Sequence, residues 1–270
     1  TRVTDLPEEL KNLQPESVFE FRNERDELIM IQKRIETRDG GRAYLPFTFW
    51  TDGLWRQMEP DGKLPLWGLN RLRDHTTVFI HEGAGAARYC DWMVTSETKS
   101  AKDALDAFPW KDEITAGAHL GWIGGALNPE RTDWKALARL GVKRAYIVSD
   151  NDDAGKRSVP KIAEQLRFTC FHLQFTNEWP KSFDMKDKWP EKMFTHIDGR
   201  RFYVGPSFRS VLHPATWATD KIEVKTEKSK KTIITLRDNF KDTWAYIEDA
   251  DLYVCTEMPD IVRTEAVLNK

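Results

Sequence analysis

Between Thr76 and about residue 175, short apolar runs alternate with segments of helical composition. Three apolar runs have the length and the β-branched and aromatic content of buried strands: TVFIHEG, RAYIVSD and FTCFHLQF. The segments around them predict helices: AGAARYCDWM, SAKDALDAF, DWKALARLG and AGKRSVPKIAEQL. Strands that alternate with helices at this spacing form a mostly parallel sheet with crossover helices. This part of the chain therefore predicts an α/β fold.

Three of these helices carry signals for where they begin, end or bend. We expect Ser100 to cap SAKDALDAF and Asp133 to cap DWKALARLG, because short polar side chains accept hydrogen bonds from the first N–H groups of a helix. Gly141 predicts the end of the second of these helices, since glycine readily adopts the left-handed conformation found there. Pro160 predicts a disturbance inside AGKRSVPKIAEQL, because proline lacks a backbone donor.

The segment that precedes Thr76 does not show this alternation of strands and helices. Residues 7 to 27 are charged and polar, with weak helical spacing. Two apolar runs then meet at Asp39-Gly40-Gly41, which is typical of a β-hairpin. LWRQME predicts another short strand, and PLWGLNRL predicts a helical turn or short helix. We therefore expect a small, mostly β subdomain over residues 1–74.

After about residue 190 the alternation of strands and helices fades. Residues 219 to 240 predict a two-stranded hairpin around a lysine-rich turn, and residues 242 to 258 predict a helix followed by a strand. We expect the α/β domain to span residues 75–192 and the remainder, 193–270, to be a linker or a partial module.

Composition limits the classes of function. The chain has 41 Lys and Arg against 43 Asp and Glu, so its net charge of −2 weakly disfavours a protein that coats nucleic acid but allows a local basic groove. Its three cysteines lie far apart and form no C-x-x-C pair, which excludes a zinc ribbon and argues against a disulfide framework. We therefore expect a reducing, cytoplasmic location.

The chain carries no run of about 18 apolar residues, so we expect no membrane span. Its opening, TRVTDLPEEL, has neither the basic nor the apolar region of a signal peptide. It also lacks an initiator Met, and we expect it to be a fragment of a longer protein.

Two acidic motifs stand at the ends of predicted strands. Glu82-Gly83 ends one strand, and Asp150-x-Asp152-x-x-Gly155 ends another. In an open parallel sheet, the carboxyl ends of neighbouring strands form the crevice in which ligands bind. Carboxylate oxygens are the ligands that Mg²⁺ prefers, and three unpaired carboxylates this close would repel one another unless a cation joined them. Gly83 and Gly155 allow the backbone to turn sharply from each strand into the helix that follows.

The string from Asp150 to Gly155 also fits two other structures. It could be a helix-capping turn with surface aspartates, or the start of an EF-hand loop. The EF-hand is disfavoured because its fifth position is Ala154, its twelfth is Lys161, and a strand precedes it where a helix is needed. The Glu82-Gly83 unit upstream favours a metal site over a simple capping turn.

Strand-Glu-Gly-helix followed by strand-Asp-x-Asp-x-x-Gly-helix is the signature of the Toprim domain, a magnesium-binding fold of primases, topoisomerases and some nucleases, and residues of about 76 to 175 resemble it. KLPLWGLNRL resembles the lead-in of bacterial primase catalytic cores, and SFDMKD resembles their later acidic motif. Overall, the chain resembles phage and mobile-element proteins that join a primase-like module to a helicase. That likeness includes the loop WIGG, the helix DWKALARLG and the segment WAYIEDADLYVCTEMPDIVRTE.

The resemblance implies a primase-type core that makes short primers on single-stranded DNA from nucleoside triphosphates. Mg²⁺ or Mn²⁺ would be its cofactor, and a helicase module would lie in the full-length chain or act in trans. Asp150 and Asp152 would hold one or two metal ions, and Glu82 would be a metal ligand or a general base. Asp184, with Asp187, would hold a further ion, or would lie in a simple loop turn.

Basic and aromatic residues complete the predicted site. Four basic residues would contact triphosphate or template phosphates: Lys63, Arg71, Arg73 and Arg88. Trp50, Trp55 and Trp67 would either stack on bases or belong to the core. His81 alternates with Glu82 along its strand, so we expect it to point to the other face and pack in the core.

The chain departs from its relatives in three ways. Ala84 and Gly85 stand where the relatives carry a charged pair, the zinc module of standard primases is absent, and no G-x-x-x-x-G-K-[ST] motif occurs. Two alternatives therefore remain beside the primase: a Toprim nuclease, and a non-catalytic single-stranded DNA-binding module. PLWGLNRL favours the primase over the nuclease. The Ala84-Gly85 departure, the missing zinc module and the slightly negative charge favour the binding module.

Overall fold

The computed structural model describes residues 17–215, apart from Asp39 and Asp74, and five strands within residues 221–264. An N-terminal antiparallel sheet has the order β1-β2-β3-β4. Its strands are β1 (Val18–Arg22), β2 (Leu28–Glu36), β3 (Arg42–Phe49) and β4 (Trp55–Arg56). The β2–β3 hairpin confirms the prediction. β1 was not predicted from the sequence; in it the buried Phe19 and Phe21 alternate with Glu20 and Arg22. The predicted helical spacing further upstream lies outside the described residues.

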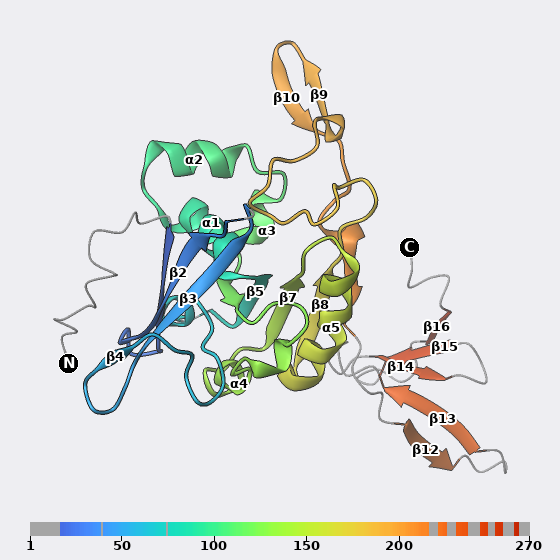
Figure 1. Cartoon of the computed structure of the whole chain (residues 1–270). Coiled ribbons are helices and arrows are strands. Elements are labelled where there is room, and N and C mark those ends of the chain that lie inside the picture. The colour runs from blue at the N-terminus through green and yellow to red at the C-terminus, as the bar shows by residue number, and fades with distance from the viewer. Residues whose placement is uncertain are drawn as a thin grey trace.

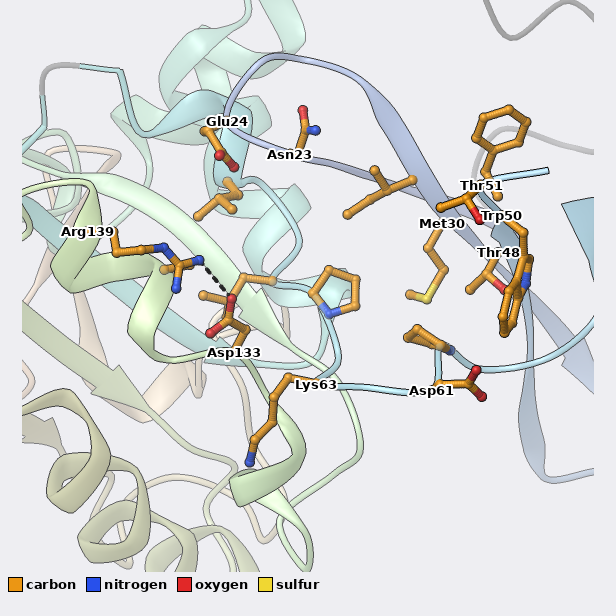
Figure 2. A pocket seen from close by; sticks show the side chains of 17 residues that line it. Asn23, Glu24, Met30, Thr48, Trp50, Thr51, Asp61, Lys63, Asp133 and Arg139 are labelled. Carbon is orange, nitrogen blue, oxygen red and sulfur yellow. Dashed lines mark hydrogen bonds and ion pairs between the residues drawn. The ribbon is translucent and has the colours of Figure 1, made fainter. Parts of the chain in front are cut away.

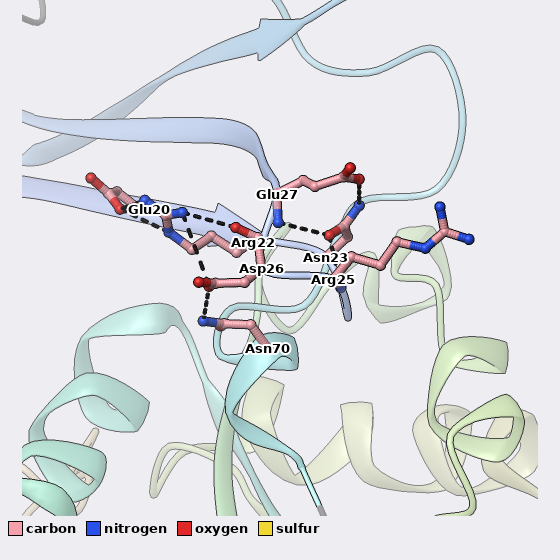
Figure 3. Close-up of polar contacts among 7 residues, drawn as sticks. All are labelled: Glu20, Arg22, Asn23, Arg25, Asp26, Glu27 and Asn70. Atoms are coloured by element: carbon pink, nitrogen blue, oxygen red, sulfur yellow. Dashed lines mark hydrogen bonds and ion pairs between the residues drawn. The ribbon is translucent and has the colours of Figure 1, made fainter. Parts of the chain in front are cut away.

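The turn between β1 and β2 fixes this sheet to the rest of the molecule (Figure 3). Asn23 Oδ1 accepts hydrogen bonds from the backbone N–H groups of Arg25 and Glu27, at 3.0 and 2.9 Å. Arg22 donates to the carbonyl of Asp26 at 2.9 Å. The Asp26 carboxylate in turn accepts from the Asn70 amide at 2.7 Å, which joins the turn to the 3₁₀ helix η3 (Leu69–Arg71).

The central sheet has the order β11-β8-β7-β5-β6. Its four parallel strands are β5 (Thr77–Glu82), β6 (Ala118–Trp122), β7 (Arg144–Val148) and β8 (Thr169–Leu173). At one edge, β11 (Leu212–Pro214) pairs antiparallel with β8. The prediction of an α/β fold with a mostly parallel sheet and a β-rich N-terminal part is confirmed. β11 joins this sheet although it follows residue 192, and the domain boundaries stay a prediction.

Helices lie on both faces of the central sheet (Figure 1). They are α1 (Ala84–Thr95), α2 (Lys99–Asp106), α3 (Lys111–Ile114), α4 (Lys135–Arg139) and α5 (Asp153–Leu166). Further short 3₁₀ helices are η4 (Pro129–Arg131), η5 (Glu191–Met193) and η6 (Arg209–Val211). α5 continues through Pro160, so the predicted disturbance does not end the helix.

Two predicted helix caps were wrong. Thr98, not Ser100, caps α2, because the chain is extended at Thr98 and its hydroxyl accepts from the N–H of Ala101 at 3.4 Å. Asp133 does not cap α4; its carboxylate instead accepts from Arg139 at 3.0 Å. Gly141 follows the end of α4 with a φ of 78°, as predicted.

Each face of the central sheet has its own core. On one face, strand residues such as Val78 and Ile147 pack with α4, α5 and the segment ahead of β5. The other face is rich in aromatic rings, many of them from the segment after β8. Trp110 and Trp189 meet edge to face there, with ring centroids 4.6 Å apart. Such pairs add to the stability that burial provides. Several of the chain's 11 tryptophans therefore belong to the core, Trp67 among them.

The remaining strands form two separate pieces. β9 (Phe194–Ile197) and β10 (Arg200–Tyr203) make a hairpin that projects from the body (Figure 1). A second antiparallel sheet runs in sequence order through β12 (Lys221–Lys225), β13 (Lys231–Leu236), β14 (Trp244–Ile247), β15 (Leu252–Cys255) and β16 (Val262–Thr264).

The predicted hairpin over residues 219 to 240 is confirmed by the pairing of β12 with β13, although its lysine-rich turn lies outside the described residues. The helix predicted within residues 242 to 258 is wrong, because β14 pairs with β15. Their sequences, WAYI and LYVC, are rich in the aromatic and β-branched residues that strands favour. Among the described helices, none has both the length and the apolar character needed to cross a bilayer.

Candidate metal centre

Glu82 and Asp150 meet at the carboxyl ends of two neighbouring strands. Glu82 is the last residue of β5, and β7 ends two residues before Asp150. The two strands pair in parallel, with His81 opposite Val148. One carboxylate oxygen of Glu82, Oε2, accepts a hydrogen bond from the backbone N–H of Asp150 at 3.2 Å. The structure therefore brings together the first two acidic residues singled out from the sequence.

Two glycines allow the chain to adopt the conformation that places Glu82 beside Asp150. Gly83 has a φ of 86°, a conformation that L-residues rarely adopt, and this lets the chain turn from β5 into α1. Gly155 is needed for space: a Cβ there would lie 2.5 Å from the carbonyl oxygen of Asp150 and 3.2 Å from Oε2 of Glu82. The first turn of α5 can therefore approach the acidic residues closely.

Asp152 caps α5, so its carboxylate already has protein donors. One oxygen accepts from the N–H of Gly155 at 2.8 Å, and the other accepts from the hydroxyl of Ser182 at 3.2 Å. The helix-capping interpretation of this string is therefore correct for Asp152. A carboxylate oxygen has more than one lone pair, so these bonds orient the group without excluding a cation.

Asn151, which lies between the two aspartates, holds the segment after β8 against the site. Its amide donates to three carbonyl groups of that segment: Thr176 and Trp179 at 3.2 Å, and Pro180 at 2.9 Å. Its backbone N–H donates to the carbonyl of Phe183 at 3.0 Å. Asn151 was not predicted as a site residue. The only sign of its role in the sequence is its position between two aspartates.

The same segment carries Asp184 and Lys186 into the site. Asp184 is buried and accepts from the backbone N–H of Lys186 at 2.8 Å, and the Lys186 ammonium pairs with its other oxygen. Asp187 accepts from the backbone N–H of Asp184 at 2.9 Å, which closes a tight turn. Asp184 therefore lies in a loop turn, as one of the two interpretations predicted, and its charge acts on Asp150. Its role as a metal ligand stays a prediction.

The electrostatics of this group favour a cation. Burial, with the nearby carboxylates of Glu82 and Asp184, raises the pKa of Asp150 to about 8, and Lys186 opposes the rise only in part. Burial also raises the pKa of Glu82. Oδ1 of Asp150 is buried and has no hydrogen-bond partner among the described residues. A buried, unpartnered carboxylate oxygen among other carboxylates fits a hard divalent cation, whose charge would stabilise the ionised form.

The four basic residues predicted to contact phosphates do not gather around this group. Lys63 bonds to the carbonyl of Glu130 and lines a pocket of about 350 Å³ between the N-terminal sheet and α4. Figure 2 shows this pocket, with Trp50 on the sheet side and Arg139 beside Asp133 on the other. None of the four predicted metal ligands lines it.

Of the other three basic residues, only Arg88 lines a groove that also includes Lys186 and Asp187. Arg71 pairs with Asp91, and its guanidinium lies 5.2 Å from the centre of the Trp67 ring. Arg73 is exposed, with a φ of 43°. Arg88 lies over Phe19 at 4.3 Å and donates to the carbonyl of Val18 at 2.8 Å.

Arg88 belongs to an open groove of about 800 Å³ along α1. The groove combines cationic and aromatic side chains with parts of the acidic loop: Phe19, Arg34, Gly85, Arg88, Tyr89, Trp92, Lys186 and Asp187. Cations and aromatic rings together are typical of surfaces that bind single-stranded nucleic acid. Arg34 was not identified from the sequence, because only the fold places β2 beside α1.

His81 packs in the core, as predicted. It is fully buried, and its Nε2 lies 2.9 Å from Nδ1 of His119 on β6. Potential ligand atoms of His81, Cys90 and His119 lie within 4.8 Å of one another. Burial lowers the pKa of both histidines, that of His119 to about 4, and raises that of the Cys90 thiol. The two imidazoles are therefore a neutral, packed pair at physiological pH.

No known family model matches the sequence, and no curated protein matches it. Among solved structures, the chain is similar to the zinc-binding and RNA polymerase domains of the Aquifex aeolicus primase, with 15% identity and a TM-score of 0.41. This match covers 62% of the present chain and 35% of the Aquifex chain.

Two further solved structures resemble the same share of the chain, 62%. One is a DNA primase domain from Pseudomonas aeruginosa, with 18% identity, a TM-score of 0.40 and 44% of that chain covered. The other is a complex of the bacteriophage T7 lagging-strand DNA polymerase with the primase domains of two gp4 subunits, bound to an RNA/DNA hybrid and dTTP. It has 11% identity, a TM-score of 0.41 and 67% of that chain covered.

Proposed function

We propose that this chain is a Toprim-type catalytic core that makes short primers on single-stranded DNA by metal-dependent nucleotidyl transfer. Mg²⁺ or Mn²⁺ would bind among Glu82, Asp150, Asp152 and Asp184. The observation that carries the proposal is the buried oxygen of Asp150, which lacks a hydrogen-bond partner and lies close to Glu82 and Asp184. Such an arrangement is costly without a cation and favourable with one.

Glu82 and a bound divalent cation would have different roles in the reaction. The 3′-oxygen of a nucleotide attacks the α-phosphorus of a nucleoside triphosphate, the bond to pyrophosphate breaks, and the hydroxyl proton must be accepted. Glu82, whose pKa is raised by burial, is the candidate acceptor, or else a metal ligand. A divalent cation bound here would favour loss of that proton and neutralise the developing phosphate charge.

The groove along α1 is the proposed path for the nucleic acid and the triphosphate. Arg34 and Arg88 would contact phosphate oxygens, and Tyr89 and Trp92 would stack on bases. Lys63, Arg71 and Arg73 lie outside the groove, so any contacts they make with the template would be more remote. A helicase module, in a longer chain or in trans, would supply the single-stranded template.

The decisive experiment compares wild type with Asp150→Asn and with Asp153→Asn, a control at an exposed position of the same turn. Each protein is incubated with single-stranded circular DNA, labelled nucleoside triphosphates and Mg²⁺ or Mn²⁺. We expect new short oligonucleotides from wild type and Asp153→Asn, and a loss of at least about 100-fold with Asp150→Asn, the size expected for a group that organises a metal site. Template shortening without new product would instead identify a nuclease.

One observation favours a second candidate, a non-catalytic DNA-binding module. Lys186 already neutralises Asp184, and both oxygens of Asp152 already accept hydrogen bonds, so the acidic group is partly satisfied by the protein itself. This candidate predicts that the DNA shifts on a gel, that no oligonucleotide forms, and that Asp150→Asn leaves the shift unchanged.

A further inference from the structure

Lys186 brings a positive charge into the group of carboxylates. Its ammonium pairs with one oxygen of Asp184, and its own backbone N–H donates to the other oxygen at 2.8 Å. Its charge also acts on Asp150, where it lowers a pKa that burial and the neighbouring acids raise. Lys186 therefore lies in the electric field of the same carboxylates that form the proposed metal site.

The lysine side chain is partly exposed, although the loop that carries it is packed into the core. Phe183 and Met185, which flank Asp184, are 1% and 0% exposed, so the loop is anchored in the aromatic core. The Lys186 side chain, by contrast, is 38% exposed, whereas that of Asp184 is 10% exposed. The ammonium can leave Asp184 by rotation of its own side chain, without movement of the loop.

Gly85, on the first turn of α1, lies next to this lysine. A Cβ at Gly85 would lie 4.0 Å from Cδ of Lys186, an ordinary van der Waals distance. Both residues line the groove along α1, together with Arg34 and Arg88. The groove is therefore the open space into which a displaced ammonium would turn.

We propose that Lys186 is a built-in counter-ion of the carboxylate group, and that its ammonium leaves Asp184 for the groove when a divalent cation binds. In the metal-free protein, Lys186 limits the repulsion among Glu82, Asp150 and Asp184. A cation that enters the group competes with the ammonium for Asp184, so part of its binding free energy is used to displace the lysine. This inference rests on the metal site of the proposed function.

The test measures metal affinity rather than activity. Free Mn²⁺ has an electron paramagnetic resonance signal that is lost on binding, so the full chain can be titrated with Mn²⁺ directly. The variants are Lys186→Met and Lys186→Gln, which remove the charge, and Lys186→Arg, which keeps it. Lys188→Met is the matched control, because it removes an exposed lysine two residues away that does not line the groove.

We expect Lys186→Met and Lys186→Gln to bind Mn²⁺ at least about tenfold more tightly than wild type, since like charges this close repel even at a high effective dielectric constant. Lys186→Arg keeps the charge at the site, and Lys188→Met removes an exposed charge that salt screens, so both should stay within about twofold of wild type. Without metal, the two neutral variants should melt below wild type at pH 8, and saturating Mn²⁺ should remove that deficit.

Three outcomes of the titration would overturn the inference. Equal affinities of wild type and the neutral variants, or the same gain with Lys188→Met, would show that no exchange occurs at Asp184 while leaving the metal site in place. Weaker binding by the neutral variants would make Lys186 a supporting residue of that site. No binding by any variant would remove both the metal site and the exchange. Tighter binding as expected, with no primer synthesis, would overturn the proposed reaction alone.

Discussion

At the scale of single residues, Asp150 should make the stability of the metal-free protein depend on pH. Its pKa is about 8 in the folded chain, against an ordinary value of 3.8. Between about pH 4 and pH 8 the folded chain therefore holds a proton that the unfolded chain has released. Stability falls with rising pH wherever the folded state binds more protons, so this contribution is complete at low pH and is lost as pH approaches 8.

Asp150→Asn removes this titration while keeping the size of the side chain. In EDTA, we expect the variant to melt several degrees above wild type at pH 8 and close to it at pH 5, since 1 kcal/mol corresponds to about 2–4 °C for a chain of this size. Thermal unfolding followed by circular dichroism measures this difference. Parallel pH profiles for the two proteins would show that Asp150 is ionised throughout. Excess Mn²⁺ at pH 8 should stabilise wild type but not the variant.

At the scale of secondary-structure elements, the site depends on how closely α5 approaches β5. We expect Gly155→Ala to displace the Asp150 carbonyl and the Glu82 carboxylate, because the added Cβ would lie 2.5 Å from the first and 3.2 Å from the second. Overpacking of this kind costs about 1–3 kcal/mol. Mn²⁺ affinity should fall together with the stability. Ala154→Gly, one position earlier in the helix, is the control: it should cost about 1 kcal/mol of helix propensity and leave Mn²⁺ affinity unchanged.

The elements also show what the sequence could and could not reveal. β5, β7 and β8 were predictable because each is an uninterrupted apolar run, and the meeting of Glu82 with Asp150 followed from placing two such strands side by side. β6 was missed because its sequence, AHLGW, contains small residues whose burial depends on close packing: a Cβ at Gly121 would lie 2.7 Å from the carbonyl of Gly83.

The remainder of the site was harder to predict because it depends on contacts between distant segments. SFDMKD was noticed in the sequence, but its place beside the strand ends is set by the hydrogen bonds of Asn151 to Thr176, Trp179 and Pro180. The ion pair of Lys186 with Asp184 depends on the same contacts. Nothing local in the sequence gives Arg34 a place beside Arg88, because β2 reaches α1 only through the packing of the N-terminal sheet.

At the scale of the whole molecule, the boundary predicted near residue 75 cuts through a shared core. Leu66, Leu69 and Leu72 lie ahead of it, yet they are buried against Val78 and Leu120 of the central sheet. The N-terminal sheet forms a separate cluster, in which Phe19 and Phe21 pack against Trp67 and α1. The segment ahead of β5 is therefore part of the α/β body as well as a link to the N-terminal sheet.

We accordingly expect residues 75–270 to fold poorly without the preceding segment. Truncating a single buried leucine to alanine costs about 2–5 kcal/mol, so losing three approaches or exceeds the 5–15 kcal/mol that stabilises a typical domain. Urea unfolding followed by tryptophan fluorescence should show a cooperative transition for residues 17–270 and none for residues 75–270. An intermediate chain, residues 60–270, restores the three leucines without the N-terminal sheet and should recover part of the cooperativity. Equal midpoints for the longest and shortest chains would instead make residue 75 a true domain boundary.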